Sequence, residues 1–174
     1  MEKNLNRKNI YEGKILTLAK DEVELDDGRK AFRELVLHRG GVCIAMKDGD
    51  QYYMVKQYRY AQGKEMYEFP AGKIEKDEDP FCAIQREAIE ETGHEAENIT
   101  GLGYMIPTCG YSSEKIYLYH GYAGKEVGQD LDEDEDMDVY RFTLSQIKEM
   151  VKNGTIDDGK TICLLYKMEL EGLS

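Results

Sequence analysis

The stretch from Asp79 to Gly93 constrains the fold of this chain more than any other, because it carries signals for both ends of a helix. Asp79 is a good N-cap, Pro80 suits the first helical position, and Gly93 can adopt the left-handed conformation that ends many helices. The sequence therefore predicts a helix over residues 80–92.

This helix is expected to place two carboxylates side by side. At about 100° per residue, Phe81, Ile84 and Ala88 fall on one stripe, which we expect to be buried. Glu87 and Glu91 lie together at one edge of that stripe. Their repulsion grows with burial, and a metal ion is the natural partner to offset it. A solvent-exposed acidic helix is the alternative interpretation.

The rest of the chain predicts strands mixed with further helices. Short runs rich in Val, Ile, Leu and Tyr predict strands at residues 32–37, 41–46, 51–57 and 115–122. A capping box at Thr143 predicts a second helix that ends at Gly154, and a third helix is expected from Asp158 to about Leu170. This mixture favours an α/β or α+β layered domain.

The first forty residues are predicted to form an antiparallel β appendage. Polar residues recur at near-alternate positions in residues 14–25, and Asp26-Asp27-Gly28 is a strong turn signal. We therefore expect an N-terminal appendage, residues 1–40, and a main domain, residues 41–174.

Charge and hydropathy argue against two classes of function. The chain has 23 Lys and Arg against 35 Asp and Glu, a net charge of −12, which repels phosphate backbones unless metal ions intervene. No apolar run reaches the roughly 18–20 residues of a membrane span, and the N-terminus has no signal-peptide pattern. We expect a cytoplasmic protein that binds neither nucleic acid nor membrane.

The residues in and before the first helix have a characteristic spacing. They are Gly72, Glu78, Arg86, Glu87, Glu90, Glu91 and Gly93. This spacing resembles the Nudix box, Gly-x5-Glu-x7-Arg-Glu-U-x-Glu-Glu-x-Gly-U, where U is a bulky aliphatic residue. Two aliphatic positions differ, because Ala88 is small and His94 occupies the last place. The chain thus resembles the Nudix hydrolase superfamily over about residues 30–165.

The Nudix resemblance implies an α/β/α sandwich with a mixed sheet that hydrolyses a nucleoside diphosphate linked to another group, using Mg²⁺ or Mn²⁺. The implied metal ligands are Glu87, Glu91, the carbonyl of Ala71 and, for a further ion, Glu90. Glu78 and Arg86 would brace the site, and Gly72 would let the backbone approach the metal.

Flanking motifs resemble the ADP-ribose pyrophosphatase branch. They are Gln57-Tyr58-Arg59, Glu68-Phe69-Pro70-Ala71-Gly72, Ser112-Ser113-Glu114-Lys115 and Gly154-x-Ile156-Asp157. One departure is Cys109-Gly110, where the branch usually has Pro-Gly. The resemblance implies hydrolysis of ADP-ribose or a related ADP-sugar to AMP and a sugar phosphate. The alternatives are a pyrophosphatase for coenzyme A, a dinucleotide or a damaged nucleoside triphosphate, and a non-catalytic nucleotide-sugar sensor.

The same resemblance suggests residues for the substrate and an assembly. Arg33 and Arg59, on or beside predicted strands, are the cations expected to contact phosphate or stack on adenine, and Glu68 is assigned to substrate binding with them. A surface ion pair is the alternative for each arginine. The branch also implies a homodimer in which residues 1–40 help to build the partner's pocket.

The segment from Asp130 to Asp138 has seven acids in nine residues. An EF-hand would need Gly at its sixth position and Glu at its twelfth, and both are missing. A solvated loop is the simplest interpretation. In the branch that this chain resembles, a glutamate from this region acts as general base, which makes Glu133 and Glu135 the candidates, with Glu133 slightly preferred.

Overall fold

The chain is divided into two compact units. The structure is a computed structural model that describes residues 1–131 and 136–173. One unit contains Met1–Gly40 and Ile106–Lys115, and the other contains Gly41–Met105 and Ile116–Ser174.

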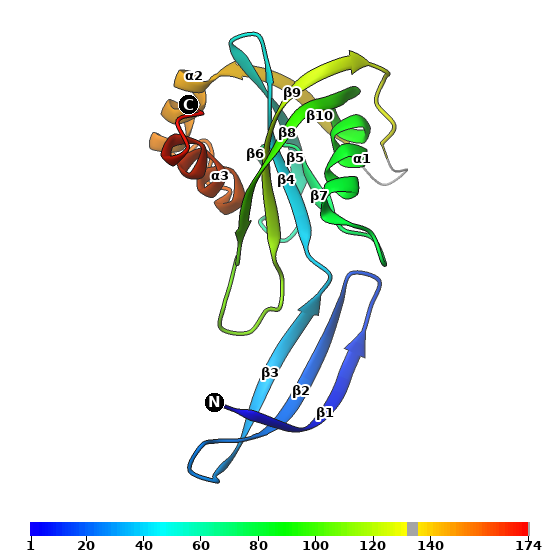
Figure 1. Ribbon diagram of the computed structural model, residues 1–174, viewed down its shortest axis with the longest axis vertical. Coiled ribbons are helices and arrows are strands. Elements are labelled where there is room, and N and C mark those ends of the chain that lie inside the picture. Colours follow the sequence, from blue (N-terminus) through cyan, green and yellow to red (C-terminus); the bar gives the residue numbers. More distant parts are fainter. Residues whose placement is uncertain (132–135, 174) are drawn as a thin grey trace. The chain divides into compact units, whose positions relative to one another are not determined.

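The first unit contains a three-stranded antiparallel sheet in the order β1-β2-β3 (Figure 1), as the pattern of the first forty residues predicted. Its strands are β1 (Lys3–Glu12), β2 (Leu16–Glu24) and β3 (Lys30–His38). A segment remote in sequence joins this sheet. The N–H of Val36 donates to the carbonyl of Tyr111 at 2.8 Å, and the N–H of Ser113 donates to the carbonyl of Val36 at 2.9 Å.

The second unit is built on a seven-stranded mixed sheet with the main order β10-β5-β4-β9-β8. In addition, β6 pairs with β5 and β7 pairs with β4. β4 and β9 run parallel, and the other pairs are antiparallel. The strands are β4 (Gly41–Asp48), β5 (Gln51–Arg59), β6 (Lys64–Glu68), β7 (Ala71–Lys73), β8 (His94–Met105), β9 (Ile116–Glu126) and β10 (Met137–Thr143).

Helices cover both faces of this sheet, which gives the α/β/α sandwich that the resemblance implied (Figure 1). They are α1 (Pro80–Thr92) on one face, and α2 (Leu144–Lys152) and α3 (Gly159–Leu170) on the other. Successive side chains of β4 point alternately to the two helical layers. Val42 and Ile44 pack in the cluster that includes α1, whereas Cys43 and Ala45 pack in the cluster that includes α2 and α3. A strand buried on both faces reads as a continuous apolar run.

Helix α1 has the bounds and caps that the sequence predicted. The Asp79 carboxylate accepts from the N–H of Phe81 at 2.8 Å, and Gly93 has a φ of 74°. Ile84 and Ala88 are fully buried, as expected. Phe81 is 45% exposed, so its assignment to the buried stripe was wrong. The reason is that burial of α1 begins only after its first three residues.

The two C-terminal helices also begin at predicted caps. Thr143 Oγ1 accepts from the N–H of Gln146 at 3.3 Å, and the Gln146 side chain accepts from the N–H of Thr143 at 2.8 Å, which completes a capping box. Asp158 caps α3 by accepting from the N–H of Thr161 at 2.9 Å. In the described part of the chain, no helix is long and apolar enough to span a membrane.

Candidate active site

Arg86, on α1, holds the loop that precedes its own helix. The guanidinium donates to Glu78 through Nε and Nη2, both at 3.0 Å, and to the carbonyl of Lys73 at 3.0 Å. Its Nη1 donates to Glu90, one turn along the helix, at 2.7 Å. The hydrogen bonds from Arg86 are the main reason that the pKa of Glu78 is lowered. Arg86 therefore joins the loop, at Lys73 and Glu78, to Glu90 on the helix.

The carboxylate of Glu87 lies directly against the backbone of Gly72. A Cβ atom added to Gly72 would fall 1.9 Å from Cδ of Glu87, so only glycine leaves room for this carboxylate. Glu87 is 8% exposed, and its Oε1 accepts from Arg86 at 2.9 Å. The glycine that opens the box and the glutamate fifteen positions later thus form one packed contact.

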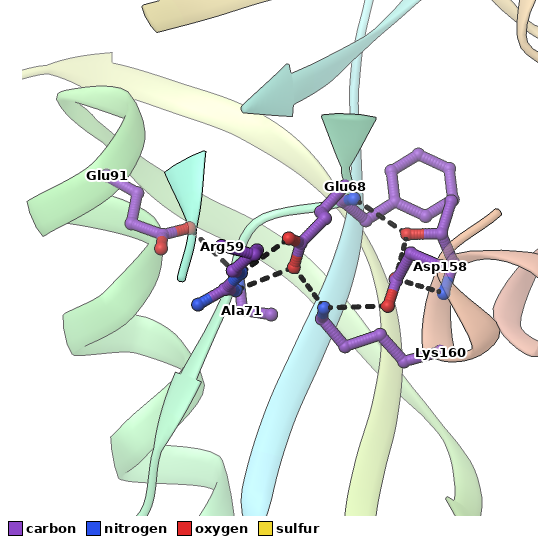
Figure 2. Close-up of polar contacts among 8 residues, drawn as sticks. Arg59, Glu68, Ala71, Glu91, Asp158 and Lys160 are labelled. Carbon is purple, nitrogen blue, oxygen red and sulfur yellow. Dashed lines mark hydrogen bonds and ion pairs between the residues drawn. The ribbon is translucent and has the colours of Figure 1, made fainter. Parts of the chain in front are cut away.

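Glu91 reaches the same short strand from the next turn of α1. Its Oε2 accepts from the N–H of Ala71 at 2.9 Å, and the residue is 3% exposed (Figure 2). Glu87 and Glu91 therefore converge on the adjacent backbone of Ala71 and Gly72, as their spacing on the helix predicted. The contact of Glu91 uses the N–H of Ala71, and the carbonyl of Ala71 remains the atom proposed for a metal.

A second group of charges lies between β5, β6 and α3 (Figure 2). Arg59 donates to the two oxygens of Glu68 through Nε and Nη2, both at 2.6 Å. Lys160 pairs with the same carboxylate and, at 3.2 Å, with Asp158. Burial opposes ionisation of Glu68, which is 1% exposed, but Arg59 and Lys160 outweigh it, and the pKa of Glu68 is lowered. Arg59 thus belongs to a bidentate pair with a buried partner, unlike an ordinary surface pair.

The backbone between these two groups is held at both ends by side chains. The N–H of Phe69 donates to Oγ1 of Thr161 at 2.9 Å, and the N–H of Ala71 donates to Glu91. Between them, the carbonyl of Pro70 accepts from the N–H of Ile44 at 2.9 Å. The Phe69–Ala71 segment therefore links α3, β4 and α1 at the candidate site.

Two family models match parts of this chain. Residues 37–165 match the family model of the NUDIX domain. The chain belongs to the Nudix family and is a Nudix hydrolase. Residues 2–36 match the model of the nucleoside diphosphate sugar hydrolase N-terminal domain. The resemblance drawn from the sequence is confirmed.

Relatives of this Nudix hydrolase align with most of its length. It is 38% identical over 173 residues to the methanol dehydrogenase activator of Bacillus methanolicus, and 33% identical over 173 residues to the ADP-ribose pyrophosphatase of Bacillus subtilis. Each of these alignments covers 98% of this chain and 94% of the relative. A GDP-mannose pyrophosphatase of Escherichia coli is 33% identical over 134 residues, covering 69% of this chain and 67% of that protein.

A solved structure supports the fold of the hydrolase. The crystal structure of an ADP compounds hydrolase has a TM-score of 0.86 to this chain at 20% identity. The match covers 99% of this chain and 96% of that one. At 20% identity this likeness supports the α/β/α fold alone.

The donor atoms of the hydrolase site fit a hard divalent cation. Glu87, Glu90 and Glu91 offer carboxylate oxygens, the ligand type that Mg²⁺ prefers, beside a glycine that leaves room for them. Within residues 1–131 and 136–173, however, no three His, Cys, Asp or Glu side chains are already gathered as a metal cluster. Glu87 and Glu90 instead bond to Arg86, so metal binding requires these hydrogen bonds to be shared or exchanged.

Of the predicted site residues, Arg33 belongs to the other compact unit, and Glu133 and Glu135 are not among the described residues. Arg33 is on β3, in the other compact unit, where its Nε donates to Glu2 at 3.0 Å. Glu133 and Glu135 lie outside the described residues. The chain that leads to them is attached to the C-terminal end of α1, because the N–H of Asp130 donates to the carbonyl of Glu90 at 3.2 Å.

Sequence reasoning missed Lys160 and the part that Asp158 has in the charged group. Asp158 was predicted only as the start of a helix, and Lys160 was not singled out. Glu68 and Lys160 are 92 positions apart, and nothing local in the sequence indicates that they meet. The one available signal was the Gly154-x-Ile156-Asp157 motif, which ends directly before Asp158 and three positions before Lys160.

Proposed function

We propose that this Nudix hydrolase cleaves the pyrophosphate of ADP-ribose or a related ADP-sugar to AMP and a sugar phosphate, with Mg²⁺ or Mn²⁺. The observation that carries the proposal is the convergence of Glu87 and Glu91 on the backbone of Ala71 and Gly72, close in sequence to the bidentate Arg59–Glu68 pair. Such a site combines oxygen ligands for a cation with a planar cation for phosphate.

Each residue of the site has a proposed role. Glu87, Glu91, Glu90 and the carbonyl of Ala71 hold the divalent ions. Glu78 and Arg86 brace the loop, as their hydrogen bonds support, and Gly72 keeps space for Glu87. Arg59 and Arg33 contact phosphate or adenine, and Glu68 positions Arg59.

The proposed reaction is the attack of water on one phosphorus atom of the pyrophosphate. A new P–O bond forms while the bridging P–O bond breaks, and the bridging oxygen leaves with the other phosphate. A bound divalent ion neutralises the pyrophosphate and makes water a better nucleophile. Glu133 or Glu135 accepts the proton of the water as general base.

The choice of an ADP-sugar is supported by the relatives and by the N-terminal unit. The Bacillus subtilis relative, aligned over 98% of this chain, is named for ADP-ribose. The match of residues 2–36 is to a domain named for nucleoside diphosphate sugar hydrolases. These observations favour a nucleoside diphosphate sugar over coenzyme A or a nucleoside triphosphate.

A substrate panel tests the proposal. The purified protein is incubated with ADP-ribose, GDP-mannose, coenzyme A and a dinucleotide, with Mg²⁺, with Mn²⁺ and with EDTA, and the products are separated by chromatography. We expect fastest turnover of ADP-ribose or another ADP-sugar to AMP and a sugar phosphate, and none in EDTA. Reaction in ¹⁸O water identifies which phosphorus is attacked. Absence of turnover with every compound would favour a non-catalytic sensor.

Activation of a dehydrogenase is a second candidate function. The observation that favours it is the 38% identity to a methanol dehydrogenase activator over 98% of this chain. The test adds the protein, with and without Mg²⁺, to a purified methanol dehydrogenase and measures the rate of alcohol oxidation. A rate increase that is lost in a Glu91→Gln variant would link the activation to the hydrolase site.

We also propose that the protein is a cytoplasmic homodimer in which residues 1–40 contribute to the partner's substrate pocket. The match of residues 2–36 to a separate domain model supports a dedicated role for this segment. The exposed apolar side chains of its sheet, which include Ile10, Tyr11 and Phe32, support a surface that another chain covers.

A further inference from the structure

We propose that Lys160 is a positioning residue for phosphate binding, which acts through Glu68 on Arg59. The inference rests on the proposed function, in which Arg59 contacts the phosphates of the substrate. Figure 2 shows Arg59 and Lys160 reaching the carboxylate of Glu68 from different directions.

The carboxylate of Glu68 is shared between two cations. Oε1 accepts from Nε of Arg59, and Oε2 accepts from both Nη2 of Arg59 and Nζ of Lys160. The side chains of Glu68 and Lys160 are 2% and 12% exposed, whereas that of Arg59 is 39% exposed. Arg59 is therefore the member of the group that can meet a ligand, and Lys160 is the buried member.

The charge of Lys160 affects how strongly Arg59 can attract a phosphate, because both cations pair with Glu68. A carboxylate buried this deeply must be neutralised by its partners. With Lys160 in place, Arg59, Lys160, Glu68 and Asp158 together are neutral, and Lys160 shares with Arg59 the neutralisation of Glu68. Without Lys160, Arg59 alone neutralises Glu68, and its attraction for a phosphate falls.

The two carboxylate oxygens of Asp158 have different partners, so its pairing with Lys160 is separate from its capping of α3. Its Oδ2 accepts from the N–H and the hydroxyl of Thr161, at 2.9 and 2.7 Å, and so caps α3. Its Oδ1 is the atom that pairs with Lys160, at 3.2 Å. Replacing Lys160 therefore leaves the cap and the link from Thr161 to Phe69 in place. A change at Lys160 tests the charge and spares the helix terminus.

The first measurement compares three variants at this position. Lys160→Met removes the charge, Lys160→Gln keeps a donor without the charge, and Lys160→Arg keeps the charge. We expect KM for the best substrate to rise about tenfold in the Met and Gln variants with kcat within about threefold, and to stay near the parent value in the Arg variant. The Gln variant decides the result if the Met variant does not fold.

Lys148→Met is the matched control, because Lys148 pairs with Glu169 at 3.2 Å on the surface of the helical layer. Its kinetics should equal those of the parent. Loss of kcat with unchanged KM in the Lys160 variants, or an equal effect in the control, would overturn the proposal.

A double-mutant cycle tests whether Lys160 acts through Arg59. In an Arg59→Gln background, Lys160→Met should raise KM by less than about twofold, because the group through which it acts is already gone. Two independent contributions would multiply, and a further rise near tenfold would sink the proposal.

Binding in EDTA separates this proposal from the proposed function. Calorimetric titration with ADP-ribose, without metal, gives a Kd that does not depend on turnover. If the parent binds ADP-ribose in EDTA but does not hydrolyse it with Mg²⁺ or Mn²⁺, the proposed function fails, and the Lys160 inference stands or falls on an about tenfold weaker Kd in the Met variant. If the parent neither binds ADP-ribose in EDTA nor hydrolyses any compound of the panel with Mg²⁺ or Mn²⁺, both fail.

Discussion

Gly72 illustrates, at the scale of a single residue, how a missing side chain can serve a site. The space that a Cβ would need is filled by the carboxylate of Glu87. The carboxylate of Glu87 is the end of a rotatable side chain, so it could move away from an added methyl group with little loss of folding stability. That movement would displace the Glu87 carboxylate from its position in the site.

We predict that Gly72→Ala leaves the fold intact but lowers turnover by about 10²-fold or more, because it displaces Glu87 from the position that faces Ala71 and Gly72. Thermal unfolding and steady-state kinetics measure the two effects. Gly159→Ala is the control, because a Cβ there meets nothing within 4 Å. Near-normal turnover of Gly72→Ala would show that the position of Glu87 is unimportant.

A second prediction at this scale concerns the general base. Either Glu133→Gln or Glu135→Gln, but not both, should lower kcat by about 10²-fold or more with little change in KM, because the lost interaction belongs to the transition state. Kinetics at saturating Mg²⁺ test both variants. If both stay within a few-fold of the parent, the base lies elsewhere, and Glu90 and Glu114 become the next candidates.

At the scale of the element, local signals determined the helices well. Both ends of α1 were predicted because its caps are encoded within the helix and its two neighbouring residues. The strands β6, β7, β8 and β10 were not predicted. β6 and β7 have 5 and 3 residues and exist as strands through their pairing with β5 and β4. In β8, register shifts against β9 break the alternation that would indicate a strand.

The candidate site divides in the same way. Glu87 and Glu91 could be placed together from helical spacing alone, and the pairing of Arg86 with Glu90 follows from the same rule. The contact of Gly72 with Glu87 was not predicted, because the family pattern implied only that Gly72 lets the backbone approach a metal. The pairing of Lys160 with Glu68 could not be predicted, since only the folded sheet and α3 bring these residues together.

The capping box of α2 gives a prediction for this scale. Thr143→Ala should lower the free energy of unfolding by about 1 kcal/mol, because the N–H of Gln146 loses its acceptor, and should leave turnover unchanged. Urea unfolding measures the difference. Thr143→Ser keeps the hydroxyl and should restore most of the stability. A loss of turnover in a folded Thr143→Ala protein would contradict the separation of this helix end from the site.

At the scale of the whole molecule, the two compact units raise the question of assembly. The N-terminal sheet and Ile106–Lys115 form one unit, and the box and the charged group belong to the other. In the homodimer proposed above, Arg33 belongs to the segment, residues 1–40, that contributes to the partner's substrate pocket.

We predict that light scattering finds the full chain to be a dimer, and that a chain starting at Gly40 is a monomer with weakened substrate affinity. Removal of residues 1–39 takes away the proposed dimer surface and the segment that shares a compact unit with Ile106–Lys115. Size and affinity are measured on the same samples, with circular dichroism to verify folding. A monomeric full chain with complete activity would exclude a shared pocket.

The way in which the Phe69–Ala71 segment is held has a consequence for the rate at which its amides exchange with solvent. The amide hydrogens of Phe69 and Ala71 bond to Thr161 and Glu91, which are 0% and 3% exposed. Phe69 lies between β6 and β7, and Ala71 is the first residue of β7; both amides require a local opening of the segment before they can exchange. Their exchange rates in deuterated water therefore report, without any substrate, how often the Phe69–Ala71 segment opens and breaks these two hydrogen bonds.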